Sequence, residues 1–240
     1  MTNADPLSPE ELRIFPVRSI GEVTPGDDLP RILSAAVELA DHDVLVVTQK
    51  VVSKAEGQLV EIDDSDPRGH KAIVESESVR IVRRRGELII SETAHGFICA
   101  NAGVDLSNVE EGYAVLLPVD SDRSARRIRD VIRAEQGVEI GVIITDTFGR
   151  PWRRGVTDVA IGSAGIGPIL DLRGTADAAG RELQVTEVAV VDELAAAAEL
   201  VMGKSTGLPA AVIRGIPTSW FRSGSVRAEV VRSPTEDLFR

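Results

Sequence analysis

The sequence is poor in cysteine and histidine, and each scarcity excludes a class of site. Cys99 is the only cysteine among 240 residues, so the chain forms no internal disulfide and offers no cysteine cluster for a metal. His42, His70 and His95 are scattered without the spacing of zinc ligands. No apolar run reaches membrane-spanning length, and the first residues lack the charged and apolar regions of a signal peptide. The sequence therefore predicts a cytoplasmic protein.

Basic residues are also outnumbered by acidic ones. The chain has 27 Lys and Arg residues against 38 Asp and Glu residues, a net charge of −11. This balance argues against general electrostatic binding to nucleic acid or to an anionic membrane. The arginines are clustered, however, and a local basic pocket in an acidic protein suits a small anionic ligand. The length allows one large domain or two small ones.

The most informative stretch runs from Val138 to Asp158. Residues 138–144 read as a buried strand, which we expect to stop at Thr145-Asp146-Thr147. Ligands in open α/β sheets bind outside the carboxyl ends of strands, and hard cations take oxygen ligands. Arginines follow directly and would suit phosphate; they are Arg150, Arg153 and Arg154. The alternative is an aspartate that caps a turn beside solvated arginines.

Hydrophobic spacing predicts a mixed α/β fold around this stretch, after a loose arm at residues 1–11. The expected strands are residues 12–17, 43–48, 88–91, 97–100, 113–119 and 210–214. The expected helices are residues 29–40, 70–85, 121–136 and 186–202.

Three other segments place polar residues next to strands or helix ends. Lys50 and Lys54 lie four residues apart after strand 43–48, which suits polyphosphate, although a solvated helix start is the more common explanation of such an isolated pair. Asp105 and Asn108 offer oxygens from a polar loop, or simply form a turn. Residues 198–205, AELVMGKS, differ from a P-loop only by Ala198 in place of the first glycine, but they close a helix, so only residues 203–207 stay a candidate phosphate cradle. With no nucleophile–histidine pair, the pattern favours metal-assisted handling of phosphate.

Longer strings carry a specific resemblance. They are DVLVVTQKVVSKAEGQLV, NAGVDLSNV, VIITDTFGRPWRRGVTDVAIG, LQVTEVAVVDELAAAAELVMGKSTGLPAAVIRG and the closing EDLF. Together they closely resemble the coenzyme F420-0:γ-glutamyl ligase family over residues 12–239. The branch that looks most similar is the actinobacterial one, in which the ligase is the N-terminal half of a two-domain protein. Residues 12–240 would then form the ligase domain, either as a stand-alone enzyme or as part of a two-domain protein whose nitroreductase-like half lies outside this sequence.

The resemblance implies an activity and an assembly. Members of this family add L-glutamate to the lactyl-phosphate tail of F420-0, a deazaflavin hydride carrier, first through an amide and then through γ-glutamyl links. They use GTP with two Mg²⁺ or Mn²⁺ ions, and K⁺ is a further candidate ion. GTP would phosphorylate the terminal carboxylate, and the amine of glutamate would attack the acyl phosphate. The implied fold is particular to the family and forms an intertwined homodimer.

The resemblance also assigns roles residue by residue. Asp105 and Asp146 look like metal ligands, with Thr147 beside a second metal, and Asp146 and Lys54 are the implied catalytic residues. The residues that resemble nucleotide contacts are Phe15, Pro16, Val17, Arg18, Gln49, Lys50, Lys54, Asn108, Met202, Gly203, Lys204, Ser205, Thr206, Gly207, Leu208 and Pro209. One departure matters: archaeal members often carry glutamine where this chain has Lys204, and an ammonium cannot ligate a cation. Lys204 would instead bind phosphate.

Two other functions use the same residues. A metal-dependent GTP hydrolase or phosphotransferase would turn over GTP without glutamate. A regulator without catalytic activity would bind GTP and metal only. A GTPase assay with and without F420-0 and glutamate separates all three.

Overall fold

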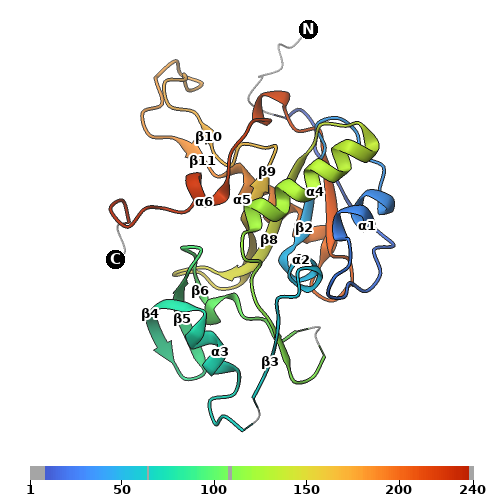
Figure 1. The fold of residues 1–240 in the computed structure, drawn as a ribbon. Coiled ribbons are helices and arrows are strands. Elements are labelled where there is room, and N and C mark those ends of the chain that lie inside the picture. The colour runs from blue at the N-terminus through green and yellow to red at the C-terminus, as the bar shows by residue number, and fades with distance from the viewer. Residues whose placement is uncertain (1–8, 64, 108–109, 238–240) are drawn as a thin grey trace.

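The computed structural model of the chain describes residues 9–63, 65–107 and 110–237. Its architecture is mixed α/β with several sheets, as the sequence predicts. The largest sheet has five strands in the order β1-β12-β2-β8-β9. Its strands β2, β8 and β9 lie side by side in Figure 1. These strands are β1 (Arg13–Pro16), β2 (Val44–Thr48), β8 (Gly141–Gly149), β9 (Val156–Ala164) and β12 (Ala210–Arg214).

The two central strands β2 and β8 run parallel, and the other neighbours pair antiparallel. Residues 44–47 and 141–144 are buried throughout, because helices and loops cover this part of the sheet. The surrounding helices are α1 (Leu29–Ala36), α2 (Gln49–Ala55), α4 (Ser121–Gln136), α5 (Val190–Met202) and α6 (Val226–Glu229). Helix α4 packs on β8 and β9, and α5 packs on β9, β12 and β1.

Local signals explain where α4 begins and ends. The Asp120 carboxylate accepts a hydrogen bond from the backbone N–H of Arg123 at 2.8 Å, which caps the helix. Gly137 ends the helix with φ 72°, a left-handed conformation that glycine adopts without a steric penalty. The predicted helix 121–136 is therefore confirmed, as is the predicted strand 210–214.

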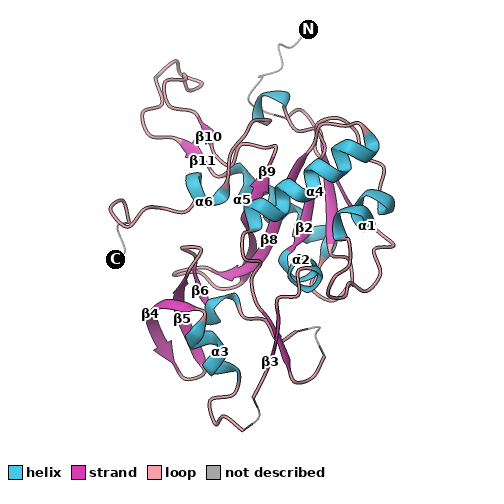
Figure 2. Cartoon of the chain, in the orientation of Figure 1, coloured by secondary structure: helices cyan, strands magenta, loops and turns pink. Residues whose placement is uncertain are grey.

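A smaller lobe lies beside the main sheet (Figure 2). It consists of α3 (His70–Ser76), β4 (Ser78–Arg85), β5 (Leu88–Thr93), β6 (Ile98–Ala100) and the 3₁₀ turn η1 (Asn101–Gly103). The predicted helix 70–85 is wrong beyond Ser76. Its second half contains three β-branched residues, Val79, Ile81 and Val82, which favour extended backbone, and β4 pairs with β5.

The remaining elements are short. They are β3 (Leu59–Glu61) paired with β7 (Tyr113–Val115), β10 (Leu170–Asp171) paired with β11 (Glu187–Val188), and the 3₁₀ turn η2 (Thr218–Trp220). Strand β7 is shorter than predicted, α1 ends at Ala36, and α5 starts at Val190 because β11 precedes it. None of the helices in the described ranges combines the length and hydrophobicity that crossing a lipid bilayer requires.

The hairpin of β8 and β9 corrects a second expectation. Strand β8 does not stop at Thr145: it continues through Asp146 and Thr147 to Gly149, because β9 pairs with it along that length. The register shifts once, since Ile144 pairs with Gly162 whereas Thr145 pairs with Ala160. Ile161 is the extra residue and forms a β-bulge. As a result Asp158 lies opposite Thr147, on the same face of the hairpin.

Candidate active site

A large cavity opens where the two parallel strands end. Thr48 at the end of β2 pairs with Thr145 in β8, so the residues that follow both positions emerge at one edge of the sheet. Helix α2 starts directly after β2, and the α5–β12 loop reaches the same place. The cavity has a volume of about 720 Å³, which is large enough for a nucleotide-sized ligand.

The positive charge of this cavity comes from lysine. The whole chain contains only four lysines, and Lys50, Lys54 and Lys204 all line it. The other charged residues in its wall are four acids, Glu22, Asp105, Asp146 and Asp158. Three of these acids each pair with one lysine, and the fourth does not.

The first pair joins α2 to the loop after η1. Lys50 Nζ lies 2.8 Å from Asp105 Oδ2 and also donates to the carbonyl and hydroxyl oxygens of Ser107, each at 2.7 Å. The backbone N–H and hydroxyl of Ser107 in turn donate to Asp105 Oδ1 at 2.8 Å. Burial alone would raise the pKa of Asp105, but the hydrogen bonds from Lys50 and Ser107 together outweigh it and hold that pKa below its usual range.

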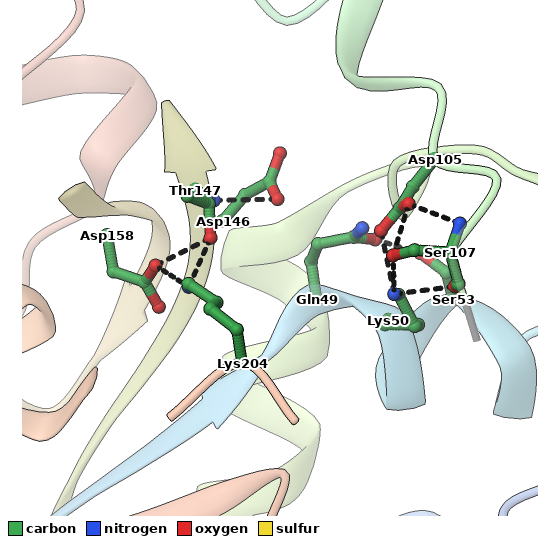
Figure 3. A network of polar contacts seen from close by, with 9 residues as sticks. All are labelled: Gln49, Lys50, Ser53, Asp105, Ser107, Asp146, Thr147, Asp158 and Lys204. Carbon is green, nitrogen blue, oxygen red and sulfur yellow. Dashed lines mark hydrogen bonds and ion pairs between the residues drawn. The ribbon is translucent and has the colours of Figure 1, made fainter. Parts of the chain in front are cut away.

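The second pair lies on the other side of β8 (Figure 3). Lys204 Nζ is 2.5 Å from Asp158 Oδ1 and donates to Thr147 Oγ1. Asp158 also accepts hydrogen bonds from Thr147 Oγ1 at 2.7 Å and from Thr145 Oγ1 at 3.2 Å. Lys204 comes from the loop after α5, so this pair ties that loop to the β8–β9 hairpin.

Asp146 lies between the two pairs and differs from both. Successive side chains of a strand point to opposite faces, and in Figure 3 the Asp146 carboxylate points away from Thr147, Asp158 and Lys204. Among the described residues no cation pairs with it, and its one hydrogen bond comes from the backbone N–H of Thr147 at 2.8 Å. The pKa of Asp146 is raised to about 7, mainly by burial and in addition by the negative charges of Asp105 and Asp158, while the Thr147 N–H and the charge of Lys204 act in the opposite direction.

The third pair, Lys54 with Glu22, lies on the α2 side of the cavity. Lys54 Nζ is 2.6 Å from Glu22 Oε1, and Glu22 is largely exposed whereas the Lys54 side chain is not. An exposed glutamate is a weak and easily displaced partner. Lys54 is therefore the lysine whose carboxylate partner a phosphate could most readily replace.

Cys99 also lines the cavity but is not equipped for chemistry. Burial raises the pKa of its thiol to about 12, with a further contribution from the negative charge of Asp146. The thiol thus stays protonated at neutral pH, whereas a nucleophile or metal ligand requires the thiolate.

The donor set of the cavity fits a hard cation whose coordination is completed by a ligand. Within residues 9–63, 65–107 and 110–237, no group of three or more His, Cys, Asp or Glu side chains is arranged to hold a metal ion. Mg²⁺ commonly uses only one or two carboxylates together with water and substrate phosphates. Asp146, with its uncompensated carboxyl, and Asp105, which raises the pKa of Asp146, are such a pair.

Comparison with known proteins identifies the family of the chain. Residues 18–215 match the family model described as F420-0:Gamma-glutamyl ligase. The chain belongs to this family. The resemblance inferred from the sequence strings is thereby confirmed.

Curated relatives match this chain over nearly their whole length. The chain is 46% identical to the coenzyme F420:L-glutamate ligase of Methanopyrus kandleri, over 95% of this chain and 98% of the relative. It is 41% identical to the protein of that name from Methanothermobacter thermautotrophicus, over 95% and 99% of the two chains. It is 40% identical to that of Archaeoglobus fulgidus, over 95% and 96%.

Most residues that the family resemblance singles out meet in this one cavity. Those that line it are Gln49, Lys50, Lys54, Asp105, Asp146, Thr147, Gly203, Lys204, Ser205, Gly207, Leu208 and Pro209. The segment after α5 therefore contributes most of its predicted residues. Met202 is buried in the core instead, and Thr206 hydrogen-bonds to the Met202 carbonyl and is not among the lining residues.

Other predicted residues lie away from the cavity wall. Phe15 lies under the Arg214 guanidinium, which is 5.6 Å from the ring centroid, and none of residues 15–18 lines the cavity. The three arginines of the β8–β9 turn do not line it either, and Arg150 donates to the carbonyl of Arg154 at 2.8 Å. Asn108 lies outside the described residues. The proposed roles of these residues stay predictions.

Sequence reasoning did not single out Asp158, Thr145 or Glu22 as site residues. Asp158 is twelve positions from Asp146 in the sequence, and only the paired register of the hairpin shows that it lies opposite Thr147. Its position in an apolar segment was the available signal, because a carboxylate there needs a partner.

Proposed function

We propose that the chain joins L-glutamate to F420-0 at the expense of GTP. Family membership and the names of the relatives support the ligation. The observation that carries the nucleotide part is that three of the four lysines in the chain line one cavity of about 720 Å³. Lysines concentrated in a single cavity of an acidic protein suit a polyphosphate.

The reaction has two steps in this proposal. An oxygen of the F420-0 carboxylate attacks the γ-phosphorus of GTP, and the bond to the bridging oxygen breaks, which releases GDP and leaves an acyl phosphate. The amine of glutamate then attacks the acyl carbon, loses a proton and expels inorganic phosphate, which forms the amide. Later glutamates would add through γ-glutamyl links by the same two steps.

The residues of the cavity have distinct roles in this reaction. Lys54 exchanges its exposed partner Glu22 for a phosphate oxygen, and Lys50 lies one helical turn before it on α2. Residues 203–209 offer backbone groups to the nucleotide, with Gly203 and Gly207 at positive φ, where the chain turns closely. Fixed charges that surround the transferred phosphoryl group stabilise the negative charge that develops on it.

A divalent cation completes the proposed site. Asp105 and Asp146 would hold Mg²⁺ or Mn²⁺, with phosphate oxygens and water as further ligands. When bound, the ion neutralises charge on the phosphate oxygens. Thr147 is a less favourable ligand in this chain than the family resemblance implies, because its hydroxyl already contacts Asp158 and Lys204.

The proposal extends to residues outside the cavity wall. Arg150, Arg153 and Arg154 would contact the phosphate of F420-0 near the β8–β9 turn, and residues 15–18 and Asn108 would contact GTP. The loop of residues 150–155 starts where the last pair of the hairpin, Gly149 and Val156, ends, and Val156 lines the cavity. A cytoplasmic homodimer and a K⁺ requirement are parts of the same proposal.

The decisive experiment is mass spectrometry of F420-0 after incubation with the protein, L-glutamate, GTP and Mn²⁺. We expect a ladder of products spaced by glutamyl units that needs all four components. Release of GDP without glutamate would favour the hydrolase or phosphotransferase instead. Binding of GTP without turnover of either substrate would favour the regulator. A variant outside the cavity, Asp130→Asn on α4, serves as the matched control for substitutions of the site aspartates.

A further inference from the structure

Lys204 makes contacts that normally belong to a metal ion. Its ammonium lies 2.5 Å from Asp158 Oδ1, donates to Thr147 Oγ1 and is 3.6 Å from Glu199 Oε1. A carboxylate, a hydroxyl and a second carboxylate are the oxygen ligands that hard cations choose. In this chain a covalently attached cation holds them.

Asp158 explains why the ammonium is fixed there. Its side chain is only 2% exposed, and its oxygens accept hydrogen bonds from two threonine hydroxyls, of Thr145 and Thr147. A carboxylate that is buried without a cation destabilises the fold strongly, so Asp158 requires a positive charge in its immediate vicinity. Thr147 donates its proton to Asp158 and accepts from Lys204, which leaves its oxygen without a favourable site for another cation.

The charges of the cavity agree with this picture. Of the four acids in its wall, Glu22, Asp105 and Asp158 each contact one lysine, and only Asp146 lacks a cation among the described residues. One divalent ion at Asp146 would compensate the remaining carboxylate. A second one would have to displace Lys204 from a buried partner.

We propose that Lys204 takes the place of a second divalent ion, so that the protein binds one metal ion, at Asp146 with Asp105. The ammonium then faces the transferred phosphate from the side of β8 opposite to that ion. This inference rests on the proposed function for the phosphate, but the number of ions does not depend on turnover.

Equilibrium dialysis with Mn²⁺ and GDP tests the inference. Bound Mn²⁺ and bound GDP are each counted per chain as the excess in the protein compartment, at saturating concentrations. We expect one Mn²⁺ and one GDP for the wild type. We expect two Mn²⁺ for Lys204→Gln, because Asp158 and Thr147 are released and an amide oxygen is added to them. Lys204→Arg keeps the positive charge and should bind one.

Lys71→Gln is the matched control, since Lys71 is the one lysine outside the cavity and pairs with Glu87 on the small lobe. It should bind one Mn²⁺. Two Mn²⁺ in the wild type would overturn the inference and leave the proposed function intact. One Mn²⁺ in both the wild type and a folded Lys204→Gln would also overturn it. If the wild type bound neither GDP nor Mn²⁺, the proposed function itself would fail. Where Lys204→Gln does not fold, the wild-type count still tests the inference: one bound Mn²⁺ supports it, and two overturn it.

Discussion

The two lysine–aspartate pairs on either side of Asp146 have similar chemistry and different surroundings. In the Lys50–Asp105 pair the side chains are 19% and 30% exposed, and Asp105 belongs to a loop. In the Lys204–Asp158 pair the lysine is 50% exposed and the aspartate 2%, and Asp158 belongs to a paired strand. The first carboxylate is within reach of solvent, and the second is buried with a solvent-accessible cation above it.

This difference determines what each pair can do when a ligand binds. Lys50 has two other acceptors on Ser107, so it can release Asp105 to a metal ion and stay hydrogen-bonded. Asp158 cannot turn toward a metal ion without breaking the hydrogen bonds that it accepts from the hydroxyls of Thr145 and Thr147. We therefore expect the Asp105 side to bind metal and the Asp158 side to position a lysine.

The largest effect should come from the residue between the pairs. Asp146→Asn removes the carboxylate that the proposed ion requires, so we expect turnover to fall by roughly 100-fold or more. The measurement is the rate at which glutamylated F420-0 appears, with Asp130→Asn as the control. Activity like that of the wild type in a folded Asp146→Asn would remove the central claim about this site.

The next prediction separates the two pairs directly. Asp105→Asn should weaken Mn²⁺ binding by roughly tenfold, because it removes a proposed ligand. Asp158→Asn should leave Mn²⁺ affinity within about twofold and lower kcat by roughly tenfold, since Lys204 loses its anchor. Mn²⁺ titrations and steady-state kinetics on both variants provide the comparison. The opposite pattern, in which Asp158→Asn loses Mn²⁺ and Asp105→Asn keeps it, would show that the ion binds on the Asp158 side of β8 and contradict the proposal.

A smaller effect concerns stability in the absence of metal. The pKa of Asp146 is raised from 3.8 to about 7 in the folded chain, so folding becomes less favourable as pH rises through that window and changes no further above it. Asn has no such titration. In the presence of a chelator, the free energy of unfolding of Asp146→Asn should therefore rise relative to that of the wild type as pH increases from 4 to 7. The relative gain should reach at least about 1 kcal/mol at pH 8. Urea unfolding at pH 5 and pH 8 measures the difference, and a pH-independent difference would contradict it.

The smallest effect belongs to the third pair. Glu22→Gln removes a largely exposed partner of Lys54, and we expect the KM for GTP to change by less than about twofold. Lys54→Gln should raise it by roughly tenfold, because a charge-assisted bond to phosphate is lost. Equal effects of the two substitutions would show that Glu22 positions Lys54 and is not displaced.

Part of this site follows from the sequence because its signals are local. Lys50, Lys54, Asp105 and Asp146 each lie next to a strand or its loop, where a run of apolar residues gives way to polar ones. The helix of residues 121–136 was predictable for the same reason, since its capping Asp120 and its terminal Gly137 directly flank the segment.

The rest depends on pairing between distant segments. Residues 78–85 contain arginines at a spacing that a helix would also allow, and only the neighbouring β5 makes them a strand. The end of β8 could not be located because β9 supplies the hydrogen bonds that extend it past Thr145. Contacts between Asp158 and Lys204 join residues 46 positions apart, which no local pattern encodes.

The bulge at Ile161 has a consequence for how the protein distributes positive charge. In an unbroken register Asp158 would stand opposite Phe148, on the face of the hairpin that carries Asp146. Two carboxylates would then compete for one counterion on one face. The additional residue moves Asp158 to the other face and gives it a lysine of its own. A single inserted amino acid, itself apolar and outside the cavity wall, thus leaves Asp146 available to the proposed metal ion and places Asp158 beside the ammonium of Lys204.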